Sequence, residues 1–480
     1  MSRSLLAALF AAIVPVAAIA AEPPPPSGPV SYFKEVRPIL QQNCQGCHQP
    51  AKAQGGYVMI THADLLKVSD SGKPGIAPGK PEASYLLDEI RVKDNKAEMP
   101  KNGSPLTAKQ YETIEKWIRE GAKDDTPVSA KAVAIDAEHP PVYQSPPVIA
   151  SVAYSPDGKL LAVTGYHEIL LYKTSDWTLD ARLVGLSERV QSLAFSTDGK
   201  QLAAAAGDPG RFGEVQIWNV EKRKLIVAAP LTFDTLYGVS WAPDGSMVAV
   251  GCTDNTLRGV SPTTGKQVLQ MGTHADWVLS TVFSQDGQHI ASVGRDMSMK
   301  LTEVATQRFV DNVTSITPGA LKGGLIALDR RPMKEKKMAK VPGDTPNAPA
   351  RVYDELVAGG SDGTPRLYKM HREVKREIGD DSNKLRQYEP MLGRISAIKF
   401  DTDGTRFAAT SGLDGKGEVS VYDVTSGKRT AKCEQVTGPA YTVAWSPDGK
   451  QLASGGFDGT VWIHDPATGK VVKSFTVMPN

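Results

Sequence analysis

The sequence has few cysteines and no excess of charge of either sign. Four cysteines in 480 residues exclude a scaffold built from disulfides. Lys and Arg total 55 against 53 Asp and Glu, which gives no basic surface for nucleic acid. Beyond the N-terminal stretch, no apolar run is long enough to cross a bilayer. We therefore expect neither a nucleic-acid partner nor a membrane span.

The first residues have the layout of a secretory signal peptide. Arg3 precedes an apolar run from Leu5 to Ile19, and small residues follow. The run is shorter than the roughly 18 apolar residues of a membrane anchor, and no cysteine stands at the cleavage site for a lipid. We predict a signal peptide over residues 1–21, cut after Ala20 or Ala21, and a protein that is periplasmic or otherwise exported.

Composition divides the rest of the chain into four segments. Residues 22–29 are a proline-rich spacer, and residues 30–125 have the apolar spacing of helices. Residues 126–147 carry five prolines and read as a linker. Residues 148–480 alternate apolar and polar residues between regularly spaced turns, which predicts an all-β domain.

Two helices are predicted in the 30–125 segment. The first follows Ser31 as its cap, and the second begins at a capping box of Thr107 and Gln110 and ends at Gly121. The apolar faces are Tyr32, Phe33, Val36, Ile39 and Leu40 in the first helix, and Tyr111, Ile114, Trp117 and Ile118 in the second.

The 148–480 segment repeats a short turn motif. "SPDG", "STDG", "APDG", "SQDG", "DTDG" and again "SPDG" each follow one alternating strand and precede another. A further unit without this motif is formed by "GGLIALDRR" and "ELVAGGSDGTPRLYKM". A period of roughly 40–45 residues with four short strands per unit is typical of a β-propeller. We predict seven blades, with six and eight as alternatives.

The stretch "NCQGCHQP" brings Cys44, Cys47 and His48 together. C-x-x-C-H is the attachment signature of c-type haem. A structural zinc site would need a second pair of ligands, and the remaining cysteines, Cys252 and Cys433, are far away. A thioredoxin-like pair would need a βαβ setting, and a simple disulfide would leave His48 unexplained. The motif predicts one covalent haem c.

An electron-transfer haem also needs a ligand on its second side. Met99 lies in the Pro- and Gly-rich loop "AEMPKNGSP" before the last helix, and a thioether there raises the reduction potential. Met59 lies in a short apolar run typical of core packing, and His62 is the other rival. We predict His48 and Met99 as the axial ligands of the iron.

These motifs resemble known families. "VRPILQQNCQGCH", the later "MP" and "LTAKQYETIEKWIREGA" are similar to the planctomycete-type cytochrome c domain, a small class I cytochrome c. This resemblance implies Cys44 and Cys47 as thioether attachment sites and His48 and Met99 as axial ligands. The repeats resemble those of WD-repeat propellers, although the Trp-Asp pair is mostly degenerate.

Other residues of the repeats carry no predicted chemistry. The five histidines of the repeat region have no metal-ligand spacing, and we expect structural or surface roles for them: His167, His274, His289, His371 and His464. Cys252 and Cys433 are expected to be separate free thiols. The insertion 330–351 has seven basic and two acidic residues; a solvated loop is favoured over a docking site for an acidic redox protein.

Three functions fit this organisation. The favoured one is an exported monohaem c-type cytochrome that transfers electrons and uses its propeller as a protein-interaction platform, with redox proteins as partners and a protein or ligand bound by the propeller. The second is an oxidoreductase with a catalytic site in the propeller, and the third is a haem-bearing sensor or binding scaffold. We expect an electron-transfer protein rather than a turnover enzyme.

Overall fold

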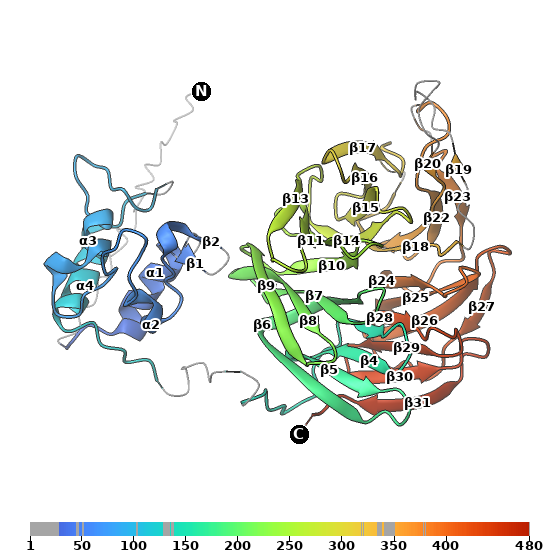
Figure 1. Cartoon of the computed structure of the whole chain (residues 1–480), viewed down its shortest axis with the longest axis horizontal. Coiled ribbons are helices and arrows are strands. Elements are labelled where there is room, and N and C mark those ends of the chain that lie inside the picture. The colour runs from blue at the N-terminus through green and yellow to red at the C-terminus, as the bar shows by residue number, and fades with distance from the viewer. Residues whose placement is uncertain are drawn as a thin grey trace, which may run out of the picture.

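The computed structural model describes residues 28–44, 48–49, 52–101, 104–127, 135, 139–317, 319, 321–333, 338–339, 351–377, 379 and 381–479. The predicted signal peptide and Cys47 lie outside these ranges, and so does most of the basic insertion, including Lys334, Lys336, Lys337 and Lys340. Figure 1 shows a helical part at the start of the chain and a larger part made of sheets. No described helix is both long and apolar enough to cross a membrane.

The helical part has short helices and one pair of short strands. They are η1 (Tyr32–Val36), α1 (Arg37–Asn43), β1 (His48–Gln49), β2 (Lys52–Ala53), η2 (Gln54–Gly56), α2 (His62–Leu65), η3 (Pro81–Ala83), α3 (Tyr85–Ile90) and α4 (Ala108–Arg119).

Both predicted helices of this part are confirmed. The Ser31 hydroxyl accepts a hydrogen bond from the Lys34 N–H at the start of η1, and Thr107 and Gln110 form the predicted capping box of α4. Gly121 ends α4 with a φ of 97°, a conformation in which a Cβ would be strained.

The core of the helical part consists of residues between Tyr32 and Ala122. Trp117 of α4 stacks on Tyr32 of η1 with ring centroids 5.3 Å apart. The other core clusters consist of residues between Ile149 and Val477. Each part of the chain therefore buries its own apolar residues.

The larger part is made of strands in chain order. The first are β3 (Val152–Tyr154), β4 (Leu160–Thr164), β5 (Tyr166–Lys173), β6 (Leu179–Phe195), β7 (Gln201–Asp208), β8 (Phe212–Asn219), β9 (Lys224–Thr232), β10 (Leu236–Trp241), β11 (Val248–Cys252), β12 (Leu257–Val260), β13 (Gln267–Met271), β14 (Val278–Phe283), β15 (His289–Gly294), β16 (Met299–Glu303) and β17 (Arg308–Asn312). The rest are β18 (Leu325–Arg330), β19 (Met338–Ala339), β20 (Arg351–Val352), β21 (Glu355–Gly360), β22 (Arg366–Lys369), β23 (Lys384–Gln387), β24 (Arg394–Phe400), β25 (Arg406–Leu413), β26 (Lys416–Asp423), β27 (Arg429–Lys432), β28 (Ala440–Trp445), β29 (Leu452–Gly456), β30 (Thr460–His464) and β31 (Val471–Thr476).

Six antiparallel sheets of four to seven strands result within the described residues, besides two strand pairs. Five of them have four strands, including the unit predicted without a turn motif, β18-β21-β22-β23, whose first two strands are separated in the chain by the pair β19-β20. The seven-stranded sheet joins two units through β6, whose first half pairs with β5 and whose second half pairs with β7. We call the strand that begins each unit its first strand; these are β3, the second half of β6, β10, β14, β18, β24 and β28. The first strands of neighbouring units contact one another around a channel, so this part is a β-propeller.

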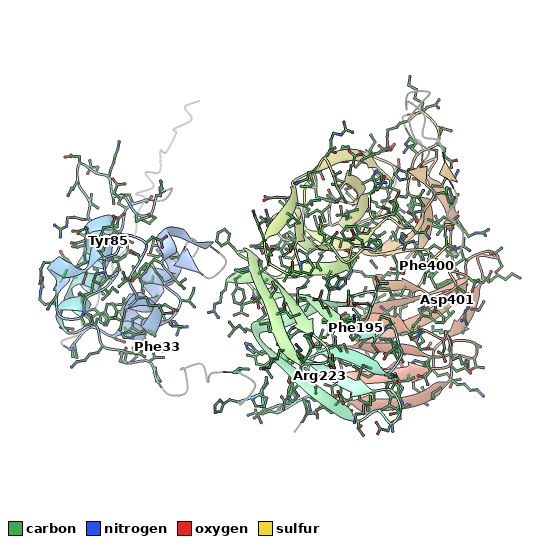
Figure 2. The ribbon with its side chains drawn as sticks, viewed as in Figure 1. Phe33, Tyr85, Phe195, Arg223, Phe400 and Asp401 are labelled. Carbon is green, nitrogen blue, oxygen red and sulfur yellow. The ribbon has the colours of Figure 1, made fainter. Side chains whose placement is uncertain are left out.

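The repeated turn motif is explained by its hydrogen bonds. In "SPDG", the Ser155 hydroxyl donates to Asp157, and Asp157 accepts from the Lys159 N–H at 3.1 Å. The hydrogen bond from Ser155 lowers the pKa of Asp157. Gly158 has a φ of 70°, which only glycine adopts readily. Phe195 and Asp401, labelled in Figure 2, stand at the ends of first strands where two further copies of the turn begin.

Ser and Thr side chains join neighbouring first strands. The Ser151 hydroxyl accepts from the Leu193 N–H at 3.1 Å, and Ser192 accepts from Val239. Thr442 accepts from the Val152 N–H at 2.9 Å, which links the last sheet to the first across 290 residues of sequence. This bond closes the circle of sheets.

The end of the predicted linker is attached to the propeller. The Tyr143 hydroxyl donates to Glu168 at 2.8 Å, and the Arg182 guanidinium donates to Glu168 at 2.7 and 2.8 Å and to the Pro141 carbonyl at 2.6 Å. Glu168 is 1% exposed. Residues 141–148, which we call the strap, therefore lie on the first sheet and line its channel.

Candidate functional site

The helical part contains a cavity of about 420 Å³ beside its core. Cys44 at the end of α1, His48 in β1 and Met99 in the loop before α4 all line it. The fold therefore places three residues named by the sequence prediction around one cavity, although Met99 is distant from Cys44 and His48 in the sequence. The fourth, Cys47, lies outside the described residues.

One ring nitrogen of His48 is engaged in a hydrogen bond with the backbone. Its Nδ1 lies 3.1 Å from the Tyr57 carbonyl oxygen, which can only accept, so Nδ1 carries the proton. Nε2 then keeps the lone pair that a metal ion requires. The backbone of His48 is fixed on both sides, by a bond from its N–H to Cys44 and one from the Met59 N–H to its carbonyl.

Tyr57 supports His48 from a fixed position. Its hydroxyl donates to the Leu65 carbonyl at 2.6 Å, and burial raises the pKa of Tyr57. A Cβ on Gly75 would lie 2.1 Å from the Tyr57 ring, so glycine is needed there. Sequence reasoning missed Tyr57, because its role is a backbone carbonyl that any residue could supply.

Met99 reaches the cavity from a loop anchored to α3. Its N–H donates to the Glu89 carbonyl at 2.9 Å, and its half-buried side chain packs against the helical core. A thioether is a soft ligand suited to haem iron. Met99 therefore lies on the cavity wall that Cys44 and His48 also line.

The two rivals of Met99 differ in position. Met59 also lines the cavity, but only 1% of it is exposed and it belongs to the core cluster. His62 is not among the cavity's residues: its Nε2 lies 2.7 Å from the Ala122 carbonyl and its ring packs edge-on against Trp117. Geometry therefore disfavours His62 and leaves Met59 as the competitor.

The remaining wall is apolar at depth and polar at the rim. Leu86, Ile90 and Leu106 supply the apolar surface, while Tyr85 and Lys101 stand among the polar lining residues. A hydrogen bond with Glu89 raises the pKa of Tyr85; Figure 2 labels Tyr85 on α3. The volume lies within the roughly 300–1,000 Å³ of small-molecule and cofactor sites. The donor set and the apolar wall fit a haem.

The propeller holds a second and larger cavity, the channel, of about 950 Å³. First strands of all the sheets line it, together with the strap. The pairing register shifts in six of these strands, which marks β-bulges that aim one residue out of the ladder. At these bulges, lining the channel, are Gln191, Tyr237, Leu279, Ile326, Ser396 and Tyr441.

A buried Ser-His-Asp array lies in the propeller. His274 Nδ1 lies 3.0 Å from Asp296, and its Nε2 lies 2.8 Å from the Ser292 hydroxyl. Burial tends to raise the pKa of Asp296, but the hydrogen bond and charge of His274 hold it at about 2. Ser292 is 1% exposed, so no substrate can reach it. The array ties a loop to a strand and is structural.

The other histidines also have structural contacts. His464 Nε2 bonds the Glu434 carbonyl, and burial lowers the pKa of His464. His167 bonds the Leu186 carbonyl, and His289 and His371 pack with ring centroids 4.7 Å apart. Among the described residues, no three His, Cys, Asp or Glu side chains are placed to hold a metal ion.

The structure also places the two cysteines of the propeller. Cys252 and Cys433 are buried in different core clusters, and neither forms a disulfide, as predicted.

The basic insertion begins between β18 and β21, where Arg331 donates a hydrogen bond to the Gly404 carbonyl in a neighbouring "DTDG" turn. Arg331, at the described start of the insertion, therefore lies on the face of the propeller that carries these turns.

Comparisons with known proteins match both parts. The model of the family "Planctomycete cytochrome C" matches residues 44–103, a span that runs from Cys44 past Met99. The model "WD domain, G-beta repeat" matches residues 231–258, 265–302 and 428–465. The prediction of WD-type repeats is confirmed.

Curated relatives are WD-repeat proteins. "Transcription factor unc-37" of Caenorhabditis elegans is 29% identical over 31% of this chain and 24% of its own length. "Guanine nucleotide-binding protein subunit beta" of Arabidopsis thaliana is 24% identical over 60% of this chain and 72% of its own. The corresponding protein of Oryza sativa subsp. indica is 21% identical over 51% and 72%. The chain spans about a quarter of unc-37.

Proposed function

We propose that this chain is an exported electron-transfer protein that binds one covalent haem c in its helical part and uses its propeller as a protein-interaction platform. The observation that carries the proposal is the cavity shared by Cys44, His48 and Met99. WD-type repeats and relatives named as G-beta subunits support the platform.

The cavity residues have distinct roles in this proposal. Cys44 and Cys47 would hold the porphyrin through thioether bonds, and His48 Nε2 and Met99 would be the ligands of its iron. The Tyr57 carbonyl fixes the His48 ring and its tautomer. The apolar wall excludes water, which keeps the local dielectric low. Haem in such a site supplies reversible one-electron chemistry at the iron.

The fold assignment follows from the same elements. We infer that the helical part is a class I cytochrome c domain, because α1 leads into C-x-x-C-H and Tyr32 of the preceding η1 packs on Trp117 of the last helix. We infer seven blades, because the seven-stranded sheet contains two units that share β6. The signal peptide over residues 1–21 remains part of the proposal and accounts for haem attachment outside the cytoplasm.

The choice of Met99 over Met59 can be tested in the ferric protein. Methionine-ligated ferric haem has a weak sulfur-to-iron band near the red end of the visible spectrum. Met99→Ala is expected to abolish this band, because it removes the thioether. Met59→Leu keeps the core volume, which costs under about 1.5 kcal/mol, and is expected to keep the band. If the band were lost in Met59→Leu but kept in Met99→Ala, the thioether ligand would be Met59 and not Met99.

A further inference from the structure

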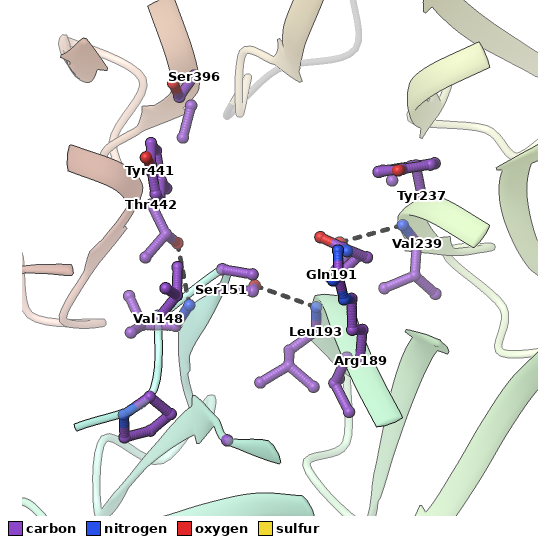
Figure 3. A pocket seen from close by; sticks show the side chains of 18 of the residues that line it. Val148, Ser151, Arg189, Gln191, Leu193, Tyr237, Val239, Ser396, Tyr441 and Thr442 are labelled. Carbon is purple, nitrogen blue, oxygen red and sulfur yellow. Dashed lines mark hydrogen bonds between the residues drawn. The ribbon is translucent and has the colours of Figure 1, made fainter. Parts of the chain in front are cut away.

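The strand β6 passes from the first unit of the propeller to the second through a short stretch outside both ladders. Val184 pairs with β5 and Arg189 pairs with β7, and residues 185–188 lie between these two pairs. We call residues 185–188 the crossing segment. Beyond it, the second half of β6 lines the channel, where Figure 3 labels Arg189, Gln191 and Leu193.

A buried carboxyl group of the second unit holds the crossing segment. The Ser187 hydroxyl, which is 0% exposed, donates to Glu214 Oε1 of β8 at 2.6 Å. The Gln216 amide donates to the same oxygen at 2.7 Å and accepts from the Trp218 indole N–H at 3.1 Å. A Cβ on Gly185 would lie 2.7 Å from that amide, so the backbone of the segment also packs directly on it. The join between the two units therefore runs through Glu214.

Two other units have a buried glutamate at the same place. The third strands contain "EILLY", "EVQIW" and "EVSVY", which begin at Glu168, Glu214 and Glu418. Glu168 pairs with Arg182 at 2.7 Å. Glu418 pairs with Arg429 at 3.0 Å and with Lys432 at 3.4 Å. In both of these units the fourth strand therefore supplies a cation that compensates the buried charge.

The second unit has an alanine where the other two have a cation. Arg182 and Lys432 each lie opposite the residue two places after the glutamate of their unit. At the corresponding place in β9 stands Ala228, which lies opposite Gln216 and is exposed. The neutral amide of Gln216 thus takes the place of a guanidinium or ammonium group beside Glu214.

The surroundings of Glu214 favour its protonated form. Glu214 is 5% exposed, and burial raises its pKa. The hydrogen bonds from its two neutral donors lower the pKa by less, and the negative charge of Asp208 raises it again. Asp208 accepts from the Glu188 N–H of the crossing segment and pairs with Arg211 at 3.1 Å.

The other titratable groups near the crossing segment have contacts of their own. His167 Nδ1 lies 3.0 Å from the Leu186 carbonyl oxygen, and Arg189 lies 3.7 Å from Glu188. Asp234, which follows β9, accepts from two backbone N–H groups. These contacts leave Glu214 as the buried acid whose charge has no cation from its own fourth strand.

We propose that Glu214 makes the join between the first two units of the propeller sensitive to pH. With its proton, Glu214 accepts the Ser187 hydroxyl as a neutral acid. When the proton leaves at higher pH, a negative charge is buried near Asp208 without the cation that Glu168 and Glu418 have. The join then weakens, while the equivalent glutamates keep their ion pairs. This inference concerns the propeller itself and goes beyond the proposed electron transfer, because it holds with or without haem.

The sign of the pH effect follows from proton linkage. In the unfolded chain a glutamate titrates near pH ~4.3. Because the pKa of Glu214 is raised in the folded protein, the folded state binds more protons than the unfolded state above that pH. The stability that Glu214 contributes is therefore fully present below the unfolded pKa and is lost as the pH rises through the folded pKa.

The test is urea unfolding of the full-length protein from about pH 5 to about pH 9, followed by tryptophan fluorescence. Six of the seven tryptophans belong to the propeller. Glu214→Gln resembles the neutral acid, so it should differ least from the parent at the lowest pH. The unfolding equilibrium constant of the parent should then rise relative to that of Glu214→Gln by up to about tenfold per pH unit. Ala228→Lys supplies the missing cation and should remove most of this rise.

Glu418→Gln is the matched control, and its effect has the opposite sign. It leaves Arg429 and Lys432 without their carboxylate, so this variant should be less stable than the parent, and raising the pH should not reverse the order. A ratio of parent to Glu214→Gln that stays constant with pH, or that moves in the parent's favour, would overturn the inference. Ala228→Lys keeps Glu214 and changes an exposed position, so it decides the matter even if Glu214→Gln fails to fold: an unchanged pH dependence in Ala228→Lys would also contradict the proposal.

Discussion

Replacing both Cys44 and Cys47 by alanine is expected to abolish covalent haem completely. Each thioether needs its own sulfur, and with both removed no bond survives denaturation. The measurement is haem staining of a denaturing gel, with protein amounts matched by immunodetection. Cys44 lies at the end of α1 on the cavity wall, so its loss removes an attachment point and leaves the helix intact.

The other two cysteines provide a matched control for this result. Cys252 and Cys433 are buried in propeller core clusters, and burial raises the pKa of each thiol to about 12, so they are unreactive. The double variant Cys252→Ala and Cys433→Ala should stain as strongly as the parent. Staining that persists without Cys44 and Cys47, or vanishes without Cys252 and Cys433, would contradict the assignment.

The second large effect is expected in the propeller at Glu168. Glu168→Ala leaves the Arg182 guanidinium, 20% exposed, without its carboxylate partner, and leaves the Tyr143 hydroxyl without its acceptor. Removing one member of a buried ion pair costs about 3–5 kcal/mol. The free energy of unfolding in urea, followed by tryptophan fluorescence, should fall by about this amount. The strap, with its bond from Arg182 to Pro141, should become sensitive to proteolysis.

Two further variants test whether the loss of stability comes from the network around Glu168. Tyr143→Phe removes two hydrogen bonds, the one donated to Glu168 and the one accepted from the Tyr166 N–H, and should cost about 1–3 kcal/mol. Glu188→Ala breaks the exposed pair with Arg189 and should cost no more than about 1 kcal/mol. If Glu168→Ala were as mild as Glu188→Ala, the strap would not be held by this network.

Local sequence signals predicted much of the fold. The capping residues Ser31, Thr107 and Gln110 act within one helical turn, so their hydrogen bonds can be read from spacing alone. The "SPDG" motif is a closed hydrogen-bonded unit of the same kind. Both were found because the chemistry that fixes them is adjacent in the chain.

Features that depend on distant residues were not predicted. The bulges at Gln191 and Tyr441 have no signal in their own strands, because a bulge is defined by pairing with a neighbour. Tyr143 reads as part of a proline-rich linker until Glu168, 25 residues later, is placed beside it. The continuous strand β6, which two repeats share, was likewise not predicted.

The candidate site also combines residues that the sequence predicted with features that only the fold shows. Cys44 and His48 are identified by a motif with a fixed spacing, and Met99 by a loop composition and its place before the last helix. The fold adds that all three line one cavity, and that the Tyr57 carbonyl sets the tautomer of His48. The sequence alone did not name what the propeller binds, because its channel is lined by strands of several sheets.

The central claim is that this chain carries one haem c between His48 and Met99. The most direct measurement is the absorption spectrum of the purified protein, oxidised and reduced, together with haem per chain from the pyridine haemochrome assay. The account predicts one haem per chain, the spectrum of a single low-spin c-type haem, and full reversibility on reduction. A protein without haem, or one with the bands of a second haem type, would contradict it.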